Sequence, residues 1–251
     1  MSRVDAVVMA GGAADAIRAG VAYKGLVAVS GKPLAQWVIE ALRAADTIDR
    51  IIVTIPSEAG RDLFESIADE VVVVDLAFSD NAVAGLERAN PERPVLMCTG
   101  DIPALIPADV DRFVTQSLAS QAAIAYPVIA QAAMERMFPG SPRTYFTLDG
   151  QQFTGGNCAL TTVEGGHRIR EIAQVVFDAR KSPLQIASMA GPVLLAKFAA
   201  GRATTAEVTK KASKILGMPA AVVRTDAASL GADVDKAADL PIVETALAAR
   251  T

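Results

Sequence analysis

The sequence predicts an α/β fold with a mostly parallel, Rossmann-like sheet, and three observations support this. The short apolar run from Ala6 to Ala10 stops at Gly11-Gly12, as a buried parallel strand does. Strand-like and helix-like segments then alternate as far as Tyr126, which favours right-handed crossovers. Finally, residues 143–148 have the alternating pattern of a strand and are followed directly by Asp149-Gly150, a dipeptide typical of hairpin turns. We therefore expect a three-layer α/β/α arrangement with a small β-hairpin and a helical part.

The remaining elements follow from local patterns. Pro33 suits the start of a helix, and the apolar residues after it repeat at intervals of three and four. Residues 71–74 are all valine, which predicts a buried strand. The other expected strands are 51–55, 94–98, 122–126 and 220–223, and the other expected helices are 56–67, 81–89, 108–118 and 240–247. Residues 165–217 look helical, with breaks at Pro183 and Gly191-Pro192.

Length and composition limit the class of protein. The 251 residues are 51% hydrophobic and 21% charged, which predicts one domain, residues 1–251, with 127–217 as its substrate-side part. A net charge of -4 without a basic block argues against nucleic acid or a membrane as partner. No secretory signal or membrane span is evident, so we expect a cytoplasmic protein. The aliphatic stretch 184–200 could be core or the contact of a homodimer.

Several catalytic classes lack the necessary residues. The one histidine, His167, lies in a polar helical stretch and is expected at the surface, so histidine triads and zinc sites are excluded. Cys98 and Cys158 are far apart in the sequence, and we expect reduced thiols, with Cys98 in the core. The sequence contains no Gly-x-Ser-x-Gly elbow, dinucleotide fingerprint or Walker A loop.

Three places carry candidate site residues. The glycine pair Gly11-Gly12 can point backbone N–H groups at a phosphate chain, and Lys24 can add a positive charge. Asp101 follows the fourth strand, and Asp233 and Asp235 follow a late strand. In open α/β sheets ligands bind beyond the carboxyl ends of the strands. Each acid alone could be a helix cap, but together the three places predict a phosphate cradle with carboxylates for Mg²⁺.

The same residues resemble a known family. The matching segments are Ala10-Gly11-Gly12, Arg18, Lys24, Gly31-Lys32-Pro33-Leu34, Gly100-Asp101-Ile102-Pro103, Asp233-Val234-Asp235 and Asp239-Leu240. In this order they resemble the MobA-like NTP transferases, which are nucleotidyltransferases of the GT-A fold and include molybdenum-cofactor guanylyltransferases. The resemblance covers residues 4–42 and 95–103 well and the middle of the chain loosely.

The resemblance implies a role for each matching residue. Ala10, Gly11, Gly12, Ala13, Arg18, Lys24, Asn81 and Gly85 would bind the NTP. Lys24 and Asp101 would be catalytic, and Asp101, Asp235 and Asp233 would hold Mg²⁺ (or Mn²⁺). Gly155, Gly156 and Asn157 would line the acceptor side, with Arg143 and Lys181 as possible ligands of the acceptor phosphate. The implied reaction transfers NMP from an NTP to a phosphorylated small-molecule acceptor and releases pyrophosphate.

Two features of the match leave alternatives open. The loop from Gly12 to Lys24 is longer than the family's by about three residues, which motivates a non-catalytic nucleotide-binding relative. The GT-A fold also occurs in glycosyltransferases that use a nucleotide-sugar, so such a glycosyltransferase is the second alternative. The family uses different bases and acceptors, so the sequence predicts neither the base nor the acceptor.

Overall fold

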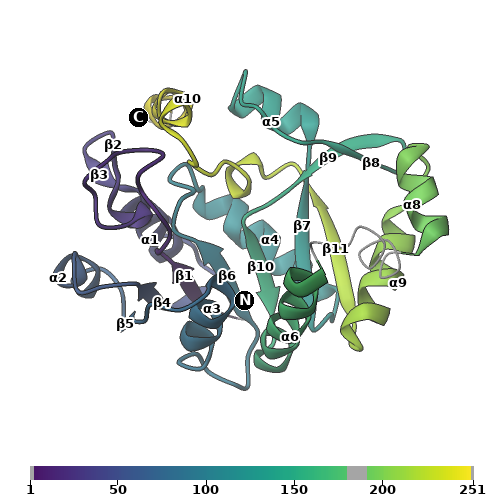
Figure 1. The fold of residues 1–251 in the computed structure, drawn as a ribbon, viewed down its shortest axis with the longest axis horizontal. Helices are drawn as coiled ribbons and strands as arrows, with labels where there is room; N and C mark the ends of the chain where they lie inside the picture. Colours follow the sequence, from purple (N-terminus) through teal and green to yellow (C-terminus); the bar gives the residue numbers. More distant parts are fainter. Residues whose placement is uncertain (1–2, 180–190, 250–251) are drawn as a thin grey trace.

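The computed structural model describes residues 3–179 and 191–249. Among them one sheet of nine strands has the order β5-β4-β1-β6-β10-β7-β9-β8, with β11 paired to β7 (Figure 1). The strands are β1 (Val4–Met9), β4 (Ile48–Ile55), β5 (Glu70–Val73), β6 (Val95–Thr99), β7 (Ile124–Ala130), β8 (Phe146–Leu148), β9 (Gln151–Gly155), β10 (Cys158–Thr161) and β11 (Ala220–Thr225). Only β9 and β10 run opposite to the others, which confirms the predicted, mostly parallel sheet.

Helices cover both faces of this sheet because successive strand residues point to opposite sides. On β1, Ala6 and Val8 belong to the core shared with α1 (Leu34–Arg43) and α4 (Pro107–Ala119). Val7, between them, packs instead with Leu86 of α3 (Phe78–Leu86). The helix α6 (Val163–Ala179) lies beside α3. The three-layer α/β/α arrangement is therefore confirmed.

The part of the chain after β7 builds the far end of the sheet. The hairpin β8–β9 turns at Asp149 and Gly150, which both have positive φ, as the Asp-Gly pair predicts. It packs against α8 (Pro192–Ala199), whose Val193 is 70% exposed. The helix α9 (Thr205–Leu216) begins with a capping box and ends at Gly217 in the left-handed conformation. Pro183 and residues 184–190 of the aliphatic stretch lie outside the described residues.

Some predicted elements differ from the structure. The valine run forms β5, but this strand is at the edge of the sheet and Val73 is 37% exposed, so the prediction of a buried strand was wrong. The helix predicted from Pro56 is α2 (Arg61–Glu65), which starts after Gly60 with φ of 76°. Local patterns did not predict the ribbon β2–β3 (Ala28–Val29 and Lys32–Pro33) or α5 (Gln131–Met137). The final helix is α10 (Leu240–Ala248).

No helix among the described residues is long and apolar enough to cross a membrane. The chain also contains three short 3₁₀ helices, η1 (Lys24–Leu26), η2 (Ala228–Leu230) and η3 (Ala237–Asp239), in the described part.

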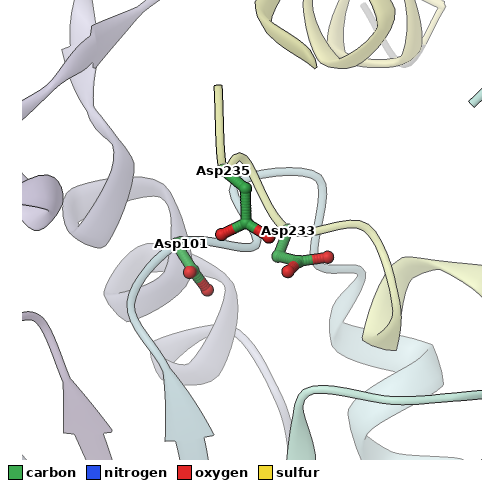
Figure 2. Close-up of side chains that lie close together, drawn as sticks. All are labelled: Asp101, Asp233 and Asp235. Atoms are coloured by element: carbon green, nitrogen blue, oxygen red, sulfur yellow. The ribbon is translucent and has the colours of Figure 1, made fainter. Parts of the chain in front are cut away.

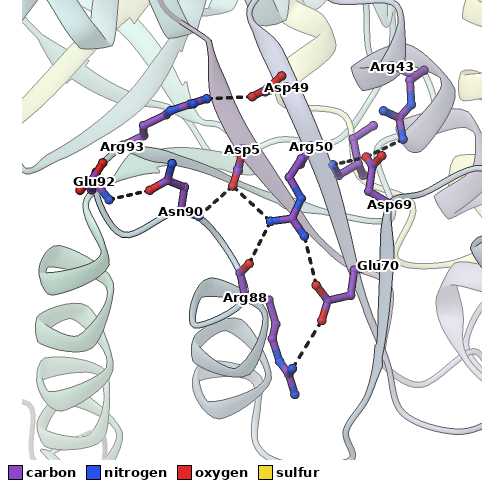
Figure 3. Close-up of polar contacts among 11 residues, drawn as sticks. Asp5, Arg43, Asp49, Arg50, Asp69, Glu70, Arg88, Asn90, Glu92 and Arg93 are labelled. Atoms are coloured by element: carbon purple, nitrogen blue, oxygen red, sulfur yellow. Dashed lines mark hydrogen bonds and ion pairs between the residues drawn. The ribbon is translucent and has the colours of Figure 1, made fainter.

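A polar network closes the amino-terminal end of the strands (Figure 3). The buried carboxylate of Asp5 accepts a hydrogen bond of 2.8 Å from the backbone N–H of Asn90 and lies 3.9 Å from the guanidinium of Arg50. Arg50 also donates to Glu70 at 3.2 Å. A buried acceptor of this kind fixes the turn before β6 to the start of β1, at the end of the sheet away from the predicted site.

Replacing Asp5 with alanine is expected to lower the free energy of unfolding by about 1–3 kcal/mol, because it leaves the part-buried N–H of Asn90 without its acceptor and removes the carboxylate beside Arg50. Asp49 provides the matched control, since its pair with Arg93 is partly exposed and its loss should cost less than about 1 kcal/mol. Urea unfolding of both variants measures the difference. Equal losses in the two variants would contradict the role assigned to Asp5.

Candidate active site

The opening loop folds back on the end of β1. The N–H of Ala10 donates to Thr54 O and its carbonyl accepts from the N–H of Gly25, each at 3.0 Å. A Cβ on Gly25 would lie 2.4 Å from the Ala10 oxygen, so only glycine permits this approach. Gly12, with φ of 97°, turns the chain so that its carbonyl accepts the Lys24 N–H at 2.8 Å. These contacts bring Lys24 to the carboxyl end of the parallel strands.

The Lys24 ammonium joins two acids that are distant in the sequence. Its Nζ lies 2.5 Å from Asp101 Oδ2 and 2.5 Å from Asp235 Oδ1. Burial, the largest single influence, lowers the pKa of Lys24, but the hydrogen bonds and charges of the two carboxylates together outweigh it and raise this pKa. The same hydrogen bond from Lys24 lowers the pKa of Asp235. The lysine therefore stays cationic and Asp235 anionic at neutral pH.

Asp101, Asp233 and Asp235 form the acidic cluster (Figure 2). Each offers a carboxylate oxygen, and these oxygens all lie within 4.8 Å of one another. The Val234 N–H donates to the Asp101 carbonyl at 3.0 Å and so attaches the late loop to the end of β6. Asp101 Oδ1 is buried and has no hydrogen-bond partner among the described residues. Carboxylate oxygens suit a hard divalent cation, and the unpaired oxygen is a free ligand position.

Arg143 is the second cation at the acidic cluster. Its guanidinium lies 2.6 Å from Asp233 Oδ1, and its side chain is only 15% exposed. Arg143 Nε is buried without a partner in the described part of the chain. A buried guanidinium N–H without an acceptor is available to an incoming anion. Lys181, which the sequence grouped with Arg143, lies outside the described residues.

A pocket of about 620 Å³ opens beside Lys24, and we call it the nucleotide pocket. Of the predicted residues, Gly11, Gly12, Ala13, Lys24, Asn81 and Asp101 line it. The lining residues that the sequence analysis missed are Met9, Ala22, Tyr23, Thr54, Pro56, Ser57, Asp75, Leu76, Phe78 and Thr99. Several of these follow the ends of β4 and β5, where open sheets bind ligands, so strand order could have indicated them. Pro56 and Ser57 were missed because the sequence analysis placed them at the start of a helix.

The other predicted nucleotide residues lie apart from this lining. Ala10 has both backbone groups bonded within the protein, and Arg18 lies on the exposed part of the opening loop. A Cβ on Gly85 would lie 2.5 Å from Val7 Cγ1, so this glycine lets α3 pack closely on β1. Among the described residues, none of these three lines the nucleotide pocket. Their nucleotide-binding roles stay predictions.

Asn81 lines the nucleotide pocket but also organises its rim. Its side-chain oxygen accepts from the Leu76 N–H at 3.0 Å, and its side-chain amide donates to Leu76 O at 3.1 Å. The side chain therefore holds the loop between β5 and α3 in place. A nucleotide that contacts Asn81 would find both of these groups already engaged.

The predicted acceptor segment 155–157 lies beside the end of β6. The N–H of Thr99 donates to Asn157 O at 3.1 Å, and the N–H of Asn157 donates to Leu230 O at 2.7 Å. A Cβ on Gly155 would lie 2.6 Å from the hydroxyl oxygen of Tyr126, so the glycine pair packs directly on β7. Asn157 Nδ2 is buried without a partner in the residues described. This segment therefore presents an unused donor beside the end of β6.

The two cysteines are neighbours in space. Cys98 on β6 and Cys158 on β10 face each other across the strand pair, with their Sγ atoms 3.2 Å apart. The hydrogen bond between the thiols and their burial raise the pKa of Cys98 well above its ordinary value. The prediction that Cys98 is a core thiol is confirmed. His167 is partly exposed beside Glu87, as expected of a surface residue.

A larger hollow of about 930 Å³ lies between α4, α5, β9 and β11. None of the predicted site residues lines it. Its polar residues include Arg112 and Arg224, but Arg224 is bonded to Gln151 at 2.8 Å. Lys24, the glycine loop and Asp101 of the acidic cluster line the nucleotide pocket instead.

Known proteins resemble this chain in both sequence and structure. The sequence profile of the MobA-like NTP transferase domain matches residues 6–148. A probable molybdenum cofactor guanylyltransferase of Pyrococcus horikoshii is 27% identical over 161 residues, which cover 64% of this chain and 80% of that protein. The solved structure of a hypothetical transferase from Thermus thermophilus is 36% identical, with a TM-score of 0.83, and the match covers 95% of this chain and 99% of that one.

Two more distant structures share the fold. CMP:2-keto-3-deoxy-manno-octonic acid synthetase complexed with CTP is 14% identical, with a TM-score of 0.63 over 100% of both chains. The 2-C-methyl-D-erythritol 4-phosphate cytidylyltransferase from Thermus thermophilus is 18% identical, with a TM-score of 0.57 over 99% of this chain and 100% of that one. At these identities the likeness shows the fold alone.

Proposed function

Since this chain belongs to the family of MobA-like NTP transferases, we propose that it transfers NMP from an NTP to a phosphorylated small-molecule acceptor, with Mg²⁺ (or Mn²⁺) as cofactor. The nucleotidyltransferase activity follows from the family, whose profile covers more than half of the chain. One observation carries the proposal. Lys24, which lines the nucleotide pocket beside Asp101, has its Nζ 2.5 Å from carboxylates of both Asp101 and Asp235.

The acidic cluster fits a divalent cation. Asp101, Asp233 and Asp235 would hold it, and the unpaired Asp101 Oδ1 supports this assignment. When bound, such an ion neutralises charge on the triphosphate and polarises the α-phosphate. With its two carboxylates engaged by a bound ion, Lys24 would be free to donate to phosphate oxygens and stabilise their charge.

The proposed step is an in-line displacement at the α-phosphorus. An oxygen of the acceptor phosphate forms the new P–O bond, while the bond from the α-phosphorus to the bridging oxygen breaks and pyrophosphate leaves with the bonding electrons. Backbone N–H groups of residues 11–13 would face the phosphates. Arg143 and the segment 155–157, with their unpaired donors, would orient the acceptor.

Binding of NTP tests the proposal first. At a hundredfold excess over the dissociation constant, the correct NTP with Mg²⁺ should add about 2.7 kcal/mol to the stability of the chain. Thermal unfolding with GTP, CTP, ATP and UTP, each with Mg²⁺ or with EDTA, measures this and identifies the base. A shift of the same size in EDTA would contradict the role of the metal, and no shift with any NTP would contradict the proposal.

The products distinguish the remaining alternatives. A nucleotidyltransferase releases pyrophosphate, whereas a glycosyltransferase that uses a nucleotide-sugar releases a nucleoside diphosphate. A non-catalytic relative would bind NTP and release neither product. Screening the NTP that binds against a panel of phosphate esters, with detection of pyrophosphate, therefore decides among the three.

A further inference from the structure

A second cavity, of about 410 Å³, adjoins the nucleotide pocket, and we call it the α3–α6 cavity. Its walls are α3 and α6 on one side and β1, β6, β7 and β10 on the other. It shares Met9, Phe78 and Thr99 with the nucleotide pocket, so the two hollows lie side by side. Its volume lies within the range of about 300–1,000 Å³ that small-molecule sites occupy. A molecule bound in it would lie next to the NTP.

The walls of the α3–α6 cavity are apolar and accessible. Phe78 is 67% exposed, Tyr126 42% and Ile169 36%, and all three face this one cavity. Exposing such large side chains to water is unfavourable, and covering them with an apolar ligand would recover that free energy. Among the described lining residues Arg170 alone is charged, and it is already paired with Asp80. A charged or heavily hydroxylated group would find few partners on these walls.

Polar atoms without partners gather at one end of the cavity. Thr99 Oγ1 and Asn157 Nδ2 are both buried and have no hydrogen-bond partner among the described residues. Both residues line the α3–α6 cavity, and Thr99 also lines the nucleotide pocket. Buried donors of this kind normally have partners, so these two indicate the position of a ligand's polar atoms. The cavity thus has a polar end at Thr99, which it shares with the nucleotide pocket, and an apolar body beyond it.

We propose that the α3–α6 cavity binds the body of the acceptor, and that this body is an uncharged, largely apolar group instead of a sugar or polyol. The inference rests on the proposed function. The acceptor phosphate lies at Thr99 and Asn157, where its oxygen reaches the α-phosphate of the neighbouring NTP. The apolar part lies between Phe78, Tyr126 and Ile169.

Three phosphate esters test this proposal. 1-Naphthyl phosphate carries an apolar body, methyl phosphate only the head group, and glucose 6-phosphate a hydroxylated body. Each is titrated by calorimetry into the chain saturated with Mg²⁺ and a non-hydrolysable analogue of the NTP that binds. We expect 1-naphthyl phosphate to bind at least about tenfold more tightly than methyl phosphate, and glucose 6-phosphate to bind no more tightly than methyl phosphate.

The two proposals can fail separately. If the chain binds no NTP, the proposed function itself is wrong. If it binds NTP but prefers 1-naphthyl phosphate by less than about tenfold, or binds glucose 6-phosphate as well as 1-naphthyl phosphate, only the apolar acceptor is wrong. The NTP titration in the same sample separates these results.

A pair of matched variants locates the binding. Ile169→Glu places a carboxylate in the α3–α6 cavity and should weaken 1-naphthyl phosphate at least about tenfold, with the binding of methyl phosphate and NTP unchanged. Val193→Glu makes the same change on the exposed face of α8, outside the cavity, and should leave all three affinities unchanged. Wild-type affinity of Ile169→Glu for 1-naphthyl phosphate, or equal losses in both variants, would overturn the proposal.

Discussion

Replacing Asp101 with asparagine is expected to lower the rate of pyrophosphate release by at least about 10²–10³-fold. Asp101 pairs with Lys24 and also carries the unpaired buried oxygen of the acidic cluster. Asparagine keeps the shape of the side chain but removes the charge that a divalent cation requires. The rate is measured with the NTP and acceptor pair that gives the highest wild-type activity.

The fold should survive this change, since Lys24 keeps its second partner, Asp235. The melting temperature and the NTP-free structure therefore serve as internal checks. Asp49→Asn is the matched control, because Asp49 is a partly exposed, ion-paired aspartate near the start of β4 and does not line the nucleotide pocket. Activity of the Asp101 variant near that of the Asp49 variant would contradict the assignment of Asp101 to the metal.

Replacing Lys24 with methionine should change catalysis and metal binding in opposite directions. The rate should fall by about 10²–10³-fold, because the lysine no longer stabilises charge on the phosphates. Without nucleotide, however, the variant should bind Mn²⁺ more tightly than the wild type does. In the wild type the Lys24 ammonium lies between two carboxylates that the ion needs, and the variant lacks this competing charge. Mn²⁺ titration followed by electron paramagnetic resonance measures the affinity.

Lys32→Met is the control for this prediction. Lys32 also pairs with a carboxylate, Glu40, at 2.6 Å, but it lies on the ribbon β2–β3 outside the nucleotide pocket. The Lys32→Met variant should keep the wild-type rate of pyrophosphate release and the wild-type affinity for Mn²⁺. If Lys24→Met lost affinity for Mn²⁺ together with activity, the lysine would be a structural support of the acidic cluster and not a competitor of the ion.

The sequence predicted the layers of the fold because local patterns carry that information. Alternating apolar runs and helical periods identified β1, β4, β6 and the helices between them, and Asp149-Gly150 identified the hairpin. Position within the sheet was harder. The valines of β5 suit an inner strand by composition, yet among the described strands β5 pairs with β4 alone. Whether a strand lies at an edge depends on the order of strands, which local composition does not contain.

The site residues likewise fall into those that local sequence predicts and those that it does not. The glycine loop, Lys24, Asp101 and the late acids could be named because each occupies a recognisable place after a strand. Other features could not be predicted because they depend on elements that only folding brings together. They are the pairing of Arg143 with Asp233, the contact of Cys98 with Cys158 and the exposure of Phe78. Gly85 was named from the family resemblance, and folding gives it a packing role that the sequence did not predict, since a Cβ there would lie 2.5 Å from Val7 Cγ1. Its nucleotide-binding role stays a prediction.

The central claim is that the glycine loop, Asp101 and the late acids act on one triphosphate and one divalent ion. A crystal structure with Mn²⁺ and a non-hydrolysable NTP analogue, using anomalous scattering to locate the metal, tests it most directly. We predict a manganese peak bound by Asp101 together with Asp233 or Asp235, and a triphosphate against Gly11 and Gly12. A metal bound elsewhere, or a nucleotide in the hollow between α4 and α5, would contradict the claim.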